Sequence, residues 1–255
     1  LVASGKEIAI ANESGGDHTL NVAGTVTNNG GMVVQARGIL NINNGGSWTQ
    51  NGTVNAAPST SAYNVQISVN TGGSFTYAGT NPFSLSSSST TGTGSATLTL
   101  NGGTFTTGKE IKNTSTGTAS TGASNLAFSN GGTLKLSANI ADLVTITTAG
   151  RTFNVTLGTG GGKIDTNGFN TTISRDITGT GSLTKLGAGT LTLSGTNSYT
   201  GATSVNAGTL SVSVPGQFSD TAALSLTTGA ELALNHPDLE EVGSFRIDGV
   251  TQTVG

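Results

Sequence analysis

The sequence predicts an all-β solenoid, a single parallel β-helix of about nine rungs over residues 1–255. Three observations predict it: an unusual composition, alternation of apolar with polar residues, and a short unit that recurs along the chain. Only 9% of residues are charged, 33% are hydrophobic and 40 are Gly, unlike an ordinary mixed globular domain. Disordered chains combine high net charge with few β-branched residues, whereas this chain has a formal net charge of −3 and is dense in Val, Ile and Thr. Composition therefore favours an ordered solenoid.

The recurring unit joins an alternating apolar run, a turn with Asn and Gly, a small hydroxyl residue and a large apolar residue. That last residue marks each repeat, and the marks are Val26, Trp48, Phe75, Phe105, Leu134, Ile164, Leu191, Leu210 and Leu232. Successive marks are 19 to 30 residues apart, and one turn with three short strands and three corners needs about 20 to 30. Nine marks predict about nine rungs, and strands about 4.8 Å apart would stack them into a rod on the order of 45 Å long.

Alternation also predicts which side chains point inward. The residues expected in stacked interior columns are Leu40, Ile42, Val65, Ile67, Val69, Leu98, Leu100, Leu126, Phe128, Val155, Leu157, Leu224 and Leu226. Trp48 and Phe75 share the repeat position of Leu134, so we expect them in the core and not in a sugar-stacking platform. Tyr63, which lies beside a polar insert, is the aromatic residue that we expect at the surface.

Asn residues precede several marks by four or five positions. They are Asn44, Asn70, Asn101, Asn130 and Asn206, and we expect them at corners because Asn tolerates left-handed backbone geometry. Their side-chain amides would hydrogen-bond from rung to rung and form a ladder. The alternative is that an exposed row of Asn side chains binds a glycan.

Longer polar inserts separate some rungs, at residues 57–62, 84–95 and 113–124. Insertions in a solenoid leave the stack at its corners and often gather on one side, where binding surfaces form. We interpret these three as loops, and any partner-specific contact is expected there or at the rod ends.

Residues 179–210 carry the most regular pattern in the chain. The residues that define it are Gly179, Gly181, Leu183, Lys185, Gly187, Gly189, Thr190, Leu191, Leu193, Gly195, Asn197, Tyr199, Gly201, Thr203, Val205, Gly208, Thr209 and Leu210. This stretch resembles the passenger-associated transport repeat, also called the autotransporter-associated β-strand repeat, of exported bacterial surface proteins. The resemblance implies a right-handed parallel β-helix outside the cell, in which the repeat is a building block and Tyr199 a packing residue. Residues 223–255 also resemble the segment that closes such arrays.

Charged residues are densest between positions 142 and 176. The members of this cluster are Asp142, Arg151, Lys163, Asp165, Arg175 and Asp176. Carboxylates beside a basic residue on neighbouring rungs are the groups that β-helical polysaccharide lyases and hydrolases use for acid–base work and for binding sugar carboxylates. Adjacent rungs would have to bring Asp142 to Asp165, or Lys163 to Arg175. The alternative interpretation is an ordinary charged solenoid surface.

The remaining candidate ligands are two His residues and an acidic C-terminal group. His18 and His236 are expected at opposite ends of the rod and exposed to solvent, so they would share neither a metal nor a proton. Asp238, Glu240, Glu241 and Asp248 would suit calcium, or would discourage strand addition at an open edge. The calcium-binding nonapeptide is absent, so we favour the second role. We assign no catalytic, cofactor-binding or metal-ligating residue.

Several function classes are disfavoured. The 10 Lys and Arg residues are scattered, which argues against a nucleic-acid surface. There is no Cys, hence no disulfide or thiolate site. No run approaches the roughly 18 apolar residues of a membrane-spanning helix, and residues 1–11 lack the pattern of a signal peptide.

The function that we expect is a non-enzymatic, extracellular structural or adhesive rod, secreted or displayed on a bacterial surface. Its partners would be a host or cell-surface glycan or protein, or further copies that stack on the rod ends into a fibre, because bare solenoid ends expose unpaired backbone groups. The alternative is a β-helical polysaccharide lyase or hydrolase, or a glycan-binding module.

Overall fold

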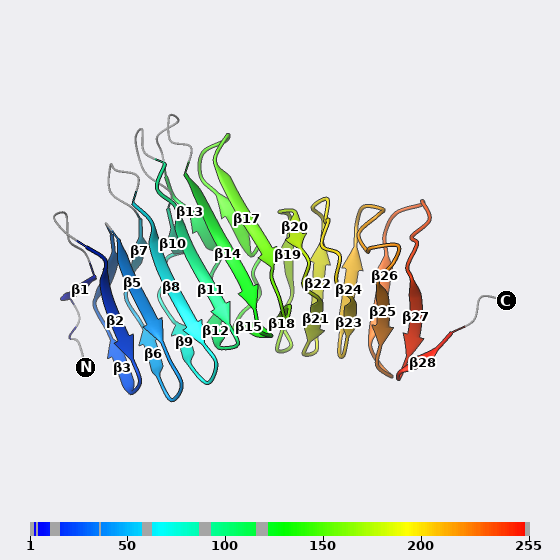
Figure 1. The fold of residues 1–255 in the computed structure, drawn as a ribbon, viewed down its shortest axis with the longest axis horizontal. Coiled ribbons are helices and arrows are strands. Elements are labelled where there is room, and N and C mark those ends of the chain that lie inside the picture. The colour runs from blue at the N-terminus through cyan, green and yellow to red at the C-terminus, as the bar shows by residue number, and fades with distance from the viewer. Residues whose placement is uncertain are drawn as a thin grey trace.

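The computed structural model describes residues 3, 5–10, 16–35, 37–57, 63–86, 93–115 and 122–252. Within these residues every regular element is a β-strand, numbered β1 to β28 (Figure 1). Part of each predicted polar insert, residues 58–62, 87–92 and 116–121, lies outside the described part of the chain. None of the described residues forms a helix long and apolar enough to cross a membrane.

Three sheets build the N-terminal section, and strands three positions apart in the chain pair in parallel. Sheet 1 begins with β3 (Thr25–Asn28), β6 (Ser47–Gln50), β9 (Ser74–Tyr77), β12 (Thr104–Thr107), β15 (Gly132–Leu136) and β18 (Gly162–Asp165). Sheet 2 contains β2 (His18–Val22), β5 (Gly38–Ile42), β8 (Val65–Asn70), β11 (Ala96–Asn101), β14 (Ala123–Ser129), β17 (Thr152–Leu157) and β20 (Ile177–Gly179). Sheet 3 contains β1 (Glu7–Ile10), β4 (Gly31–Val34), β7 (Val54–Ala56), β10 (Phe83–Leu85), β13 (Ile111–Asn113) and β16 (Val144–Ile146). The chain is therefore a parallel β-helix, which confirms the predicted fold class.

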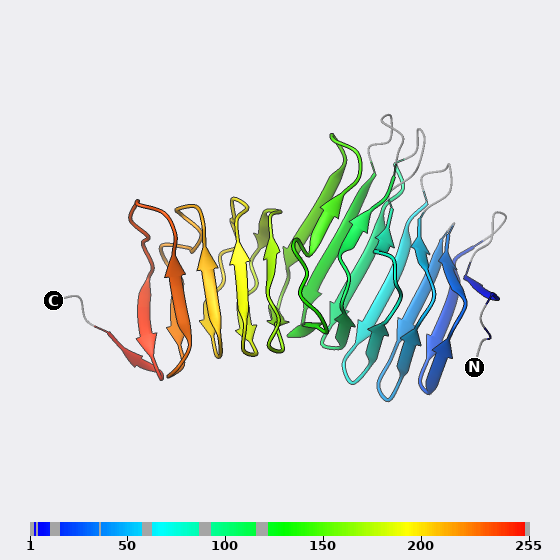
Figure 2. The same ribbon diagram turned by 180° about the vertical axis from the view of Figure 1, so that it is seen from behind.

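The rod narrows in its C-terminal section, where only two sheets continue (Figures 1 and 2). Sheet 1 runs on through β21 (Leu183–Leu186), β23 (Thr203–Val205), β25 (Ala223–Leu226) and β27 (Ser244–Ile247), and ends with the antiparallel β28 (Val250–Thr251). Sheet 4 contains β19 (Thr171–Ile173), β22 (Thr190–Leu193), β24 (Thr209–Val212) and β26 (Glu231–Leu234). The expectation of three strands in every rung is wrong here.

The third side of this narrow section is closed by side chains and irregular backbone. Next to β20, the amide of Ser198 donates to the carbonyl of Ile177 at 2.9 Å. The amide of Ile177 donates to Asn197 Oδ1 at 2.8 Å, and Asn197 Nδ2 in turn donates to Gln217 Oε1. One rung further, the amide of Phe218 donates to Glu240 Oε1 at 2.9 Å. A polar side-chain seam thus replaces the missing strand ladder.

The core is a set of stacked columns. The predicted inward residues are buried, except Leu226, which is half-buried. Trp48 and Phe75 are fully buried in register with Phe105, as predicted. The Phe75 ring lies 5.3 Å from that of Phe105, and Phe83 enters from sheet 3 with its ring 5.0 Å from that of Phe105. Edge-to-face contacts of this kind add to the hydrophobic stabilisation of the column.

The repeat marks do not stay in one column. Those from Val26 to Ile164 lie in sheet 1 and are matched in register from strand to strand. The sheet 1 residue that continues this column is Lys185, and Leu191 lies in sheet 4. Sheet 1 contains ten parallel strands among the described residues; six of them carry a mark, and the last three marks lie on β22, β24 and β26 of sheet 4.

Three corners between sheets 2 and 1, at residues 45–46, 72–73 and 102–103, depend on two successive Gly residues with different roles. Gly102 has φ of 76°, a left-handed conformation that Gly adopts without a steric penalty. At Gly103, a Cβ would lie 2.5 Å from the carbonyl oxygen of Asn70 in the preceding rung. The first Gly makes the turn and the second permits close stacking, which explains the recurring Asn-Gly-Gly and Thr-Gly-Gly units.

The Asn ladder forms at one of these corners. Asn70 donates to Asn43 at 2.8 Å, Asn101 to Asn70 at 3.0 Å and Asn130 to Asn101 at 2.6 Å. The prediction holds for these three residues, but Asn43 replaces Asn44 as the first member. Ile42 is in register with Val69, so it is the residue after Ile42 that stacks beneath Asn70. Asn206 lies between β23 of sheet 1 and β24 of sheet 4, at a different corner, so the prediction that it joins the ladder is wrong.

Candidate functional site

A hollow of about 340 Å³ lies at the step between the wide and the narrow section. Strand β17 spans six residues, but β20 pairs only with Val155–Leu157, so Thr152, Phe153 and Asn154 form the outer edge of sheet 2 at this point. In Figures 1 and 2 this end of β17 projects beyond the shorter rungs that follow. We call the surface formed by residues 151–154 and 174–176 the shoulder. It contains three of the six charged residues that the sequence singled out.

Two arginines line this hollow. Arg175 is half-buried, and no described residue forms a hydrogen bond or ion pair with its guanidinium; its Nε is shielded from solvent. Arg151 is only 6% exposed. A guanidinium offers several N–H donors in a planar fork, so Arg175 presents donors to the hollow that the described residues do not use.

The carboxylates in and near the shoulder accept hydrogen bonds, mostly from backbone amides. Asp176 Oδ1 accepts a 2.7 Å hydrogen bond from the amide of Thr196 in the next rung. Asp142 accepts hydrogen bonds from the hydroxyl and amide of Ser174 and from the amide of Val144. Both carboxylates therefore hold loops of adjacent rungs together.

The predicted charge cluster is split between two faces of the rod. Lys163 and Asp165 lie on β18 in sheet 1, where Asp165 forms an ion pair with Lys135 at 3.5 Å. Asp142 contacts Ser174 instead. The pairing of Asp142 with Asp165 that the enzymatic alternative would need is not seen, because Asp142 contacts Ser174 and Asp165 contacts Lys135.

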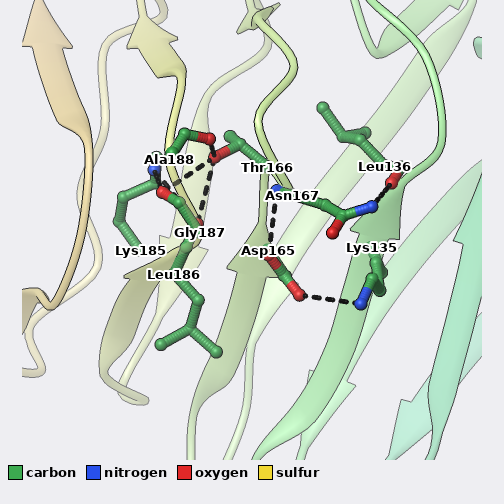
Figure 3. A network of polar contacts seen from close by, with 9 residues as sticks. All are labelled: Lys135, Leu136, Asp165, Thr166, Asn167, Lys185, Leu186, Gly187 and Ala188. Carbon is green, nitrogen blue, oxygen red and sulfur yellow. Dashed lines mark hydrogen bonds and ion pairs between the residues drawn. The ribbon is translucent and has the colours of Figure 1, made fainter.

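The best-connected polar group lies at the end of β21, and Figure 3 shows it. Lys185 is fully buried, yet its ammonium donates to the carbonyls of Leu186 at 3.0 Å, Gly187 at 2.7 Å and Ala207 at 3.0 Å. From the preceding rung, Thr166 Oγ1 donates to the Ala188 carbonyl at 2.7 Å. All three ammonium protons thus have acceptors, as a buried charge requires.

Burial changes the acidity of this lysine. Desolvation lowers the pKa of Lys185 from 10.5 to about 8, and the negative charge of Asp165 acts in the opposite direction. The ammonium is enclosed by backbone carbonyls that connect two rungs, which is the geometry of a structural clamp and not of a nucleophile open to a substrate.

The acidic C-terminal residues do not gather into one site. Glu240 lies 3.5 Å from His236 Nε2, and both side chains are almost completely buried. The expectation that His236 is exposed to solvent is therefore wrong, because it packs beneath the last rungs beside Glu240. His18, at the other end, is half-buried. The hydroxyl and amide of Thr228 hold the pKa of Asp248 below its usual value.

In the described part of the chain, no three His, Cys, Asp or Glu residues lie close enough to hold a metal ion. Tyr199 is buried and its hydroxyl contacts Thr203 Oγ1 at 2.8 Å, as expected for a packing residue. Tyr63 is half-buried, and the guanidinium carbon of Arg37 lies 4.5 Å from its ring centroid.

Taken together, fold and surface define a parallel β-helical rod whose best candidate for ligand contact is the shoulder. Residues 183–212, which form β21 to β24, match the passenger-associated-transport-repeat family. The chain is also 36% identical over 150 residues to the adhesin BmaC autotransporter of Brucella suis biovar 1 (strain 1330). That match covers 55% of this chain and 4% of the relative. No solved structure matches the chain.

Proposed function

We propose that this chain is a non-enzymatic adhesive segment of an exported bacterial surface protein. The family match falls on rungs that continue the sheet 1 stack without interruption, and this observation carries the proposal. The likeness to an autotransporter adhesin supports the same function. The partner would be a glycan or protein on a host cell or on a neighbouring cell.

An adhesion assay tests the proposal. Beads coated with the folded 255-residue chain are placed on layers of cultured epithelial cells and washed under flow. We expect strong retention, and beads coated with the heat-denatured chain serve as the control. Retention no greater than that of uncoated beads would count against adhesion.

The enzymatic alternative, a polysaccharide lyase or hydrolase, has its own test. Asp176 in the shoulder accepts from the amide of Thr196, and Asp142 nearby accepts from the amide of Val144 and the hydroxyl of Ser174, which favours a structural role for both. Incubation with acidic and neutral polysaccharides should release no unsaturated or reducing-end products. Product formation that disappears in Asp176→Asn would establish the enzyme instead.

Self-association into a fibre is a further part of this proposal. Exposed apolar residues gather near the C-terminal end at Leu234, Leu239, Ile247 and Val250, and such patches favour association. The antiparallel β28 covers part of the sheet 1 edge, which limits strand addition there. Electron micrographs of the concentrated chain distinguish fibres from single rods, and single rods at every concentration would exclude the fibre.

A further inference from the structure

We propose that the shoulder binds an acidic saccharide through the carboxylate of one sugar residue. This inference rests on the adhesive function proposed above and names the ligand class for one surface of the rod. The carboxylate would lie against Arg175, with the neighbouring sugar hydroxyls over the polar side chains of β17.

The guanidinium of Arg175 supplies the charge for this site. It lines the hollow without a hydrogen bond or ion pair to any described residue, and its Nε has lost contact with water. A carboxylate bound in a bidentate manner satisfies such a group with two parallel charge-assisted hydrogen bonds. Arg151 adds a second positive charge to the lining of the same hollow.

Uncharged polar side chains surround the two arginines. Thr152, Asn154 and Ser174 line the hollow, and all three are exposed. Hydroxyl and amide groups both donate and accept hydrogen bonds, so they suit a ligand with many hydroxyls.

Asp176 sets a limit on the ligand. Its exposed side chain also lines the hollow, and a polyanion placed along the whole surface would meet its negative charge. A single carboxylate beside Arg175, with sugar hydroxyls donating towards Asp176, avoids this repulsion. The shoulder therefore fits a saccharide with spaced carboxylates better than a densely charged chain.

An extended peptide that adds a strand to sheet 2 fits less well. The free edge of β17 covers only Thr152, Phe153 and Asn154. Alternate residues of a parallel strand direct their backbone groups to the same side. A peptide would consequently gain few main-chain hydrogen bonds, whereas strand addition depends on a row of them.

Titration calorimetry on the 255-residue chain tests the inference, with hyaluronan oligosaccharides, in which a carboxylated sugar alternates with a neutral one, as the carboxylated probe. Dextran oligosaccharides serve as the neutral probe, dextran sulfate as the sulfated probe and poly-glutamate as the acidic peptide. We expect binding to the hyaluronan oligosaccharides, with weaker or no binding to the other three. Because one charge-assisted contact is removed, Arg175→Ala should weaken this binding by about tenfold or more.

Two further variants separate the shoulder from general electrostatics. Arg175→Lys keeps the charge but loses the planar fork, so it should also bind more weakly than the unmodified chain. Arg246→Ala removes the same charge from an exposed position on β27 and should leave affinity unchanged. Circular dichroism and thermal unfolding check that all variants are folded.

Three results would overturn the inference. One is equal affinity for poly-glutamate or dextran sulfate; a second is equal loss of affinity in Arg175→Ala and Arg246→Ala. The third is undiminished binding in folded Arg175→Ala. Bead retention that persists in this variant, alongside any of these results, would leave the adhesive function standing while the saccharide site fails. Failure of the adhesive function would instead abolish retention for every bead.

Discussion

At the residue scale, Lys185 is the most informative side chain. It occupies the sheet 1 column that holds Trp48 and Phe75 further towards the N-terminus, and it is as fully buried as they are. Its neighbours in register are Ile164 and Val205. Removing an unpaired ammonium from water is prohibitively unfavourable, so the three carbonyl acceptors are what allow it to remain there.

The stability of the protein should therefore depend on pH in a particular direction. The pKa of Lys185 is about 8 in the folded chain and about 10.5 in the unfolded one, so between these values the unfolded state binds a proton that the folded state lacks. The free energy of unfolding should rise by about 1 to 2 kcal/mol between about pH 7.5 and about pH 9.5. Urea unfolding at each pH measures this rise.

A matched pair of variants tests whether the rise in the free energy of unfolding comes from Lys185. Lys185→Met should abolish it, whereas Lys163→Met, which changes an exposed lysine on β18, should retain it. Burial raises the pKa of Tyr77 and Tyr199 to about 12, so stability should fall again above about pH 10 as the unfolded chain loses tyrosine protons. An equal rise in both lysine variants would contradict the assignment.

At the element scale, polar side chains connect rungs in two ways. In the wide section the Asn ladder runs along one corner beside complete strand pairing. In the narrow section the seam of Asn197, Gln217 and Glu240 takes the place of a strand ladder. Both arrangements repeat with the rung, so each side chain stabilises its neighbours only.

The ladder gives a sharp test because two Asn residues share a sequence context but differ in structure. Asn101 donates to Asn70 and accepts from Asn130, so Asn101→Ala should lower the free energy of unfolding by about 1 to 2 kcal/mol. Asn206 is exposed, and Asn206→Ala should change the free energy of unfolding by less than about 0.5 kcal/mol. Chemical unfolding of both variants decides this, and equal losses would refute the ladder's contribution.

The features that depend on local interactions could be predicted from the sequence. Alternation located the buried columns, and the Asn-Gly-Gly units located the corners, since both patterns follow from a strand and a turn. The change from three sheets to two was missed because the marks keep the same local form while moving from sheet 1 to sheet 4. The 19 residues from Leu191 to Leu210 are the shortest spacing, but the 22 residues that follow also separate Val26 from Trp48 in a three-stranded rung, so spacing did not reveal the change.

The candidate site was less accessible from sequence. The charged residues between 142 and 176 were noticed, but which of them share a face depends on loop lengths that alternation does not reveal. The inward position of Lys185 could have been found, because it alternates with Leu183 on β21. The seam could not, because its residues lie in irregular segments and are related only by spacings of 20 and 22 residues.

At the scale of the whole molecule, sheet 1 runs through both the wide and the narrow section, whereas sheets 2 and 3 end near the step between them and sheet 4 begins there (Figure 1). Strands stack from β3 to β27 with parallel register throughout. Narrowing at β20 creates the shoulder without interrupting sheet 1. A rod of this kind keeps its interior closed and leaves binding to its surface and ends.

The central claim, a folded β-helical rod displayed outside the cell, can be tested directly because the chain contains no Cys. Single Cys residues are introduced at Thr152, which is exposed, and at Val155, which is 1% exposed on the same strand. Bacteria that export the full-length protein are then treated with a membrane-impermeant maleimide. We predict that Thr152→Cys is labelled on intact cells and Val155→Cys only after denaturation. Labelling of Thr152→Cys only after cell lysis, or equal labelling of both on intact cells, would contradict the account.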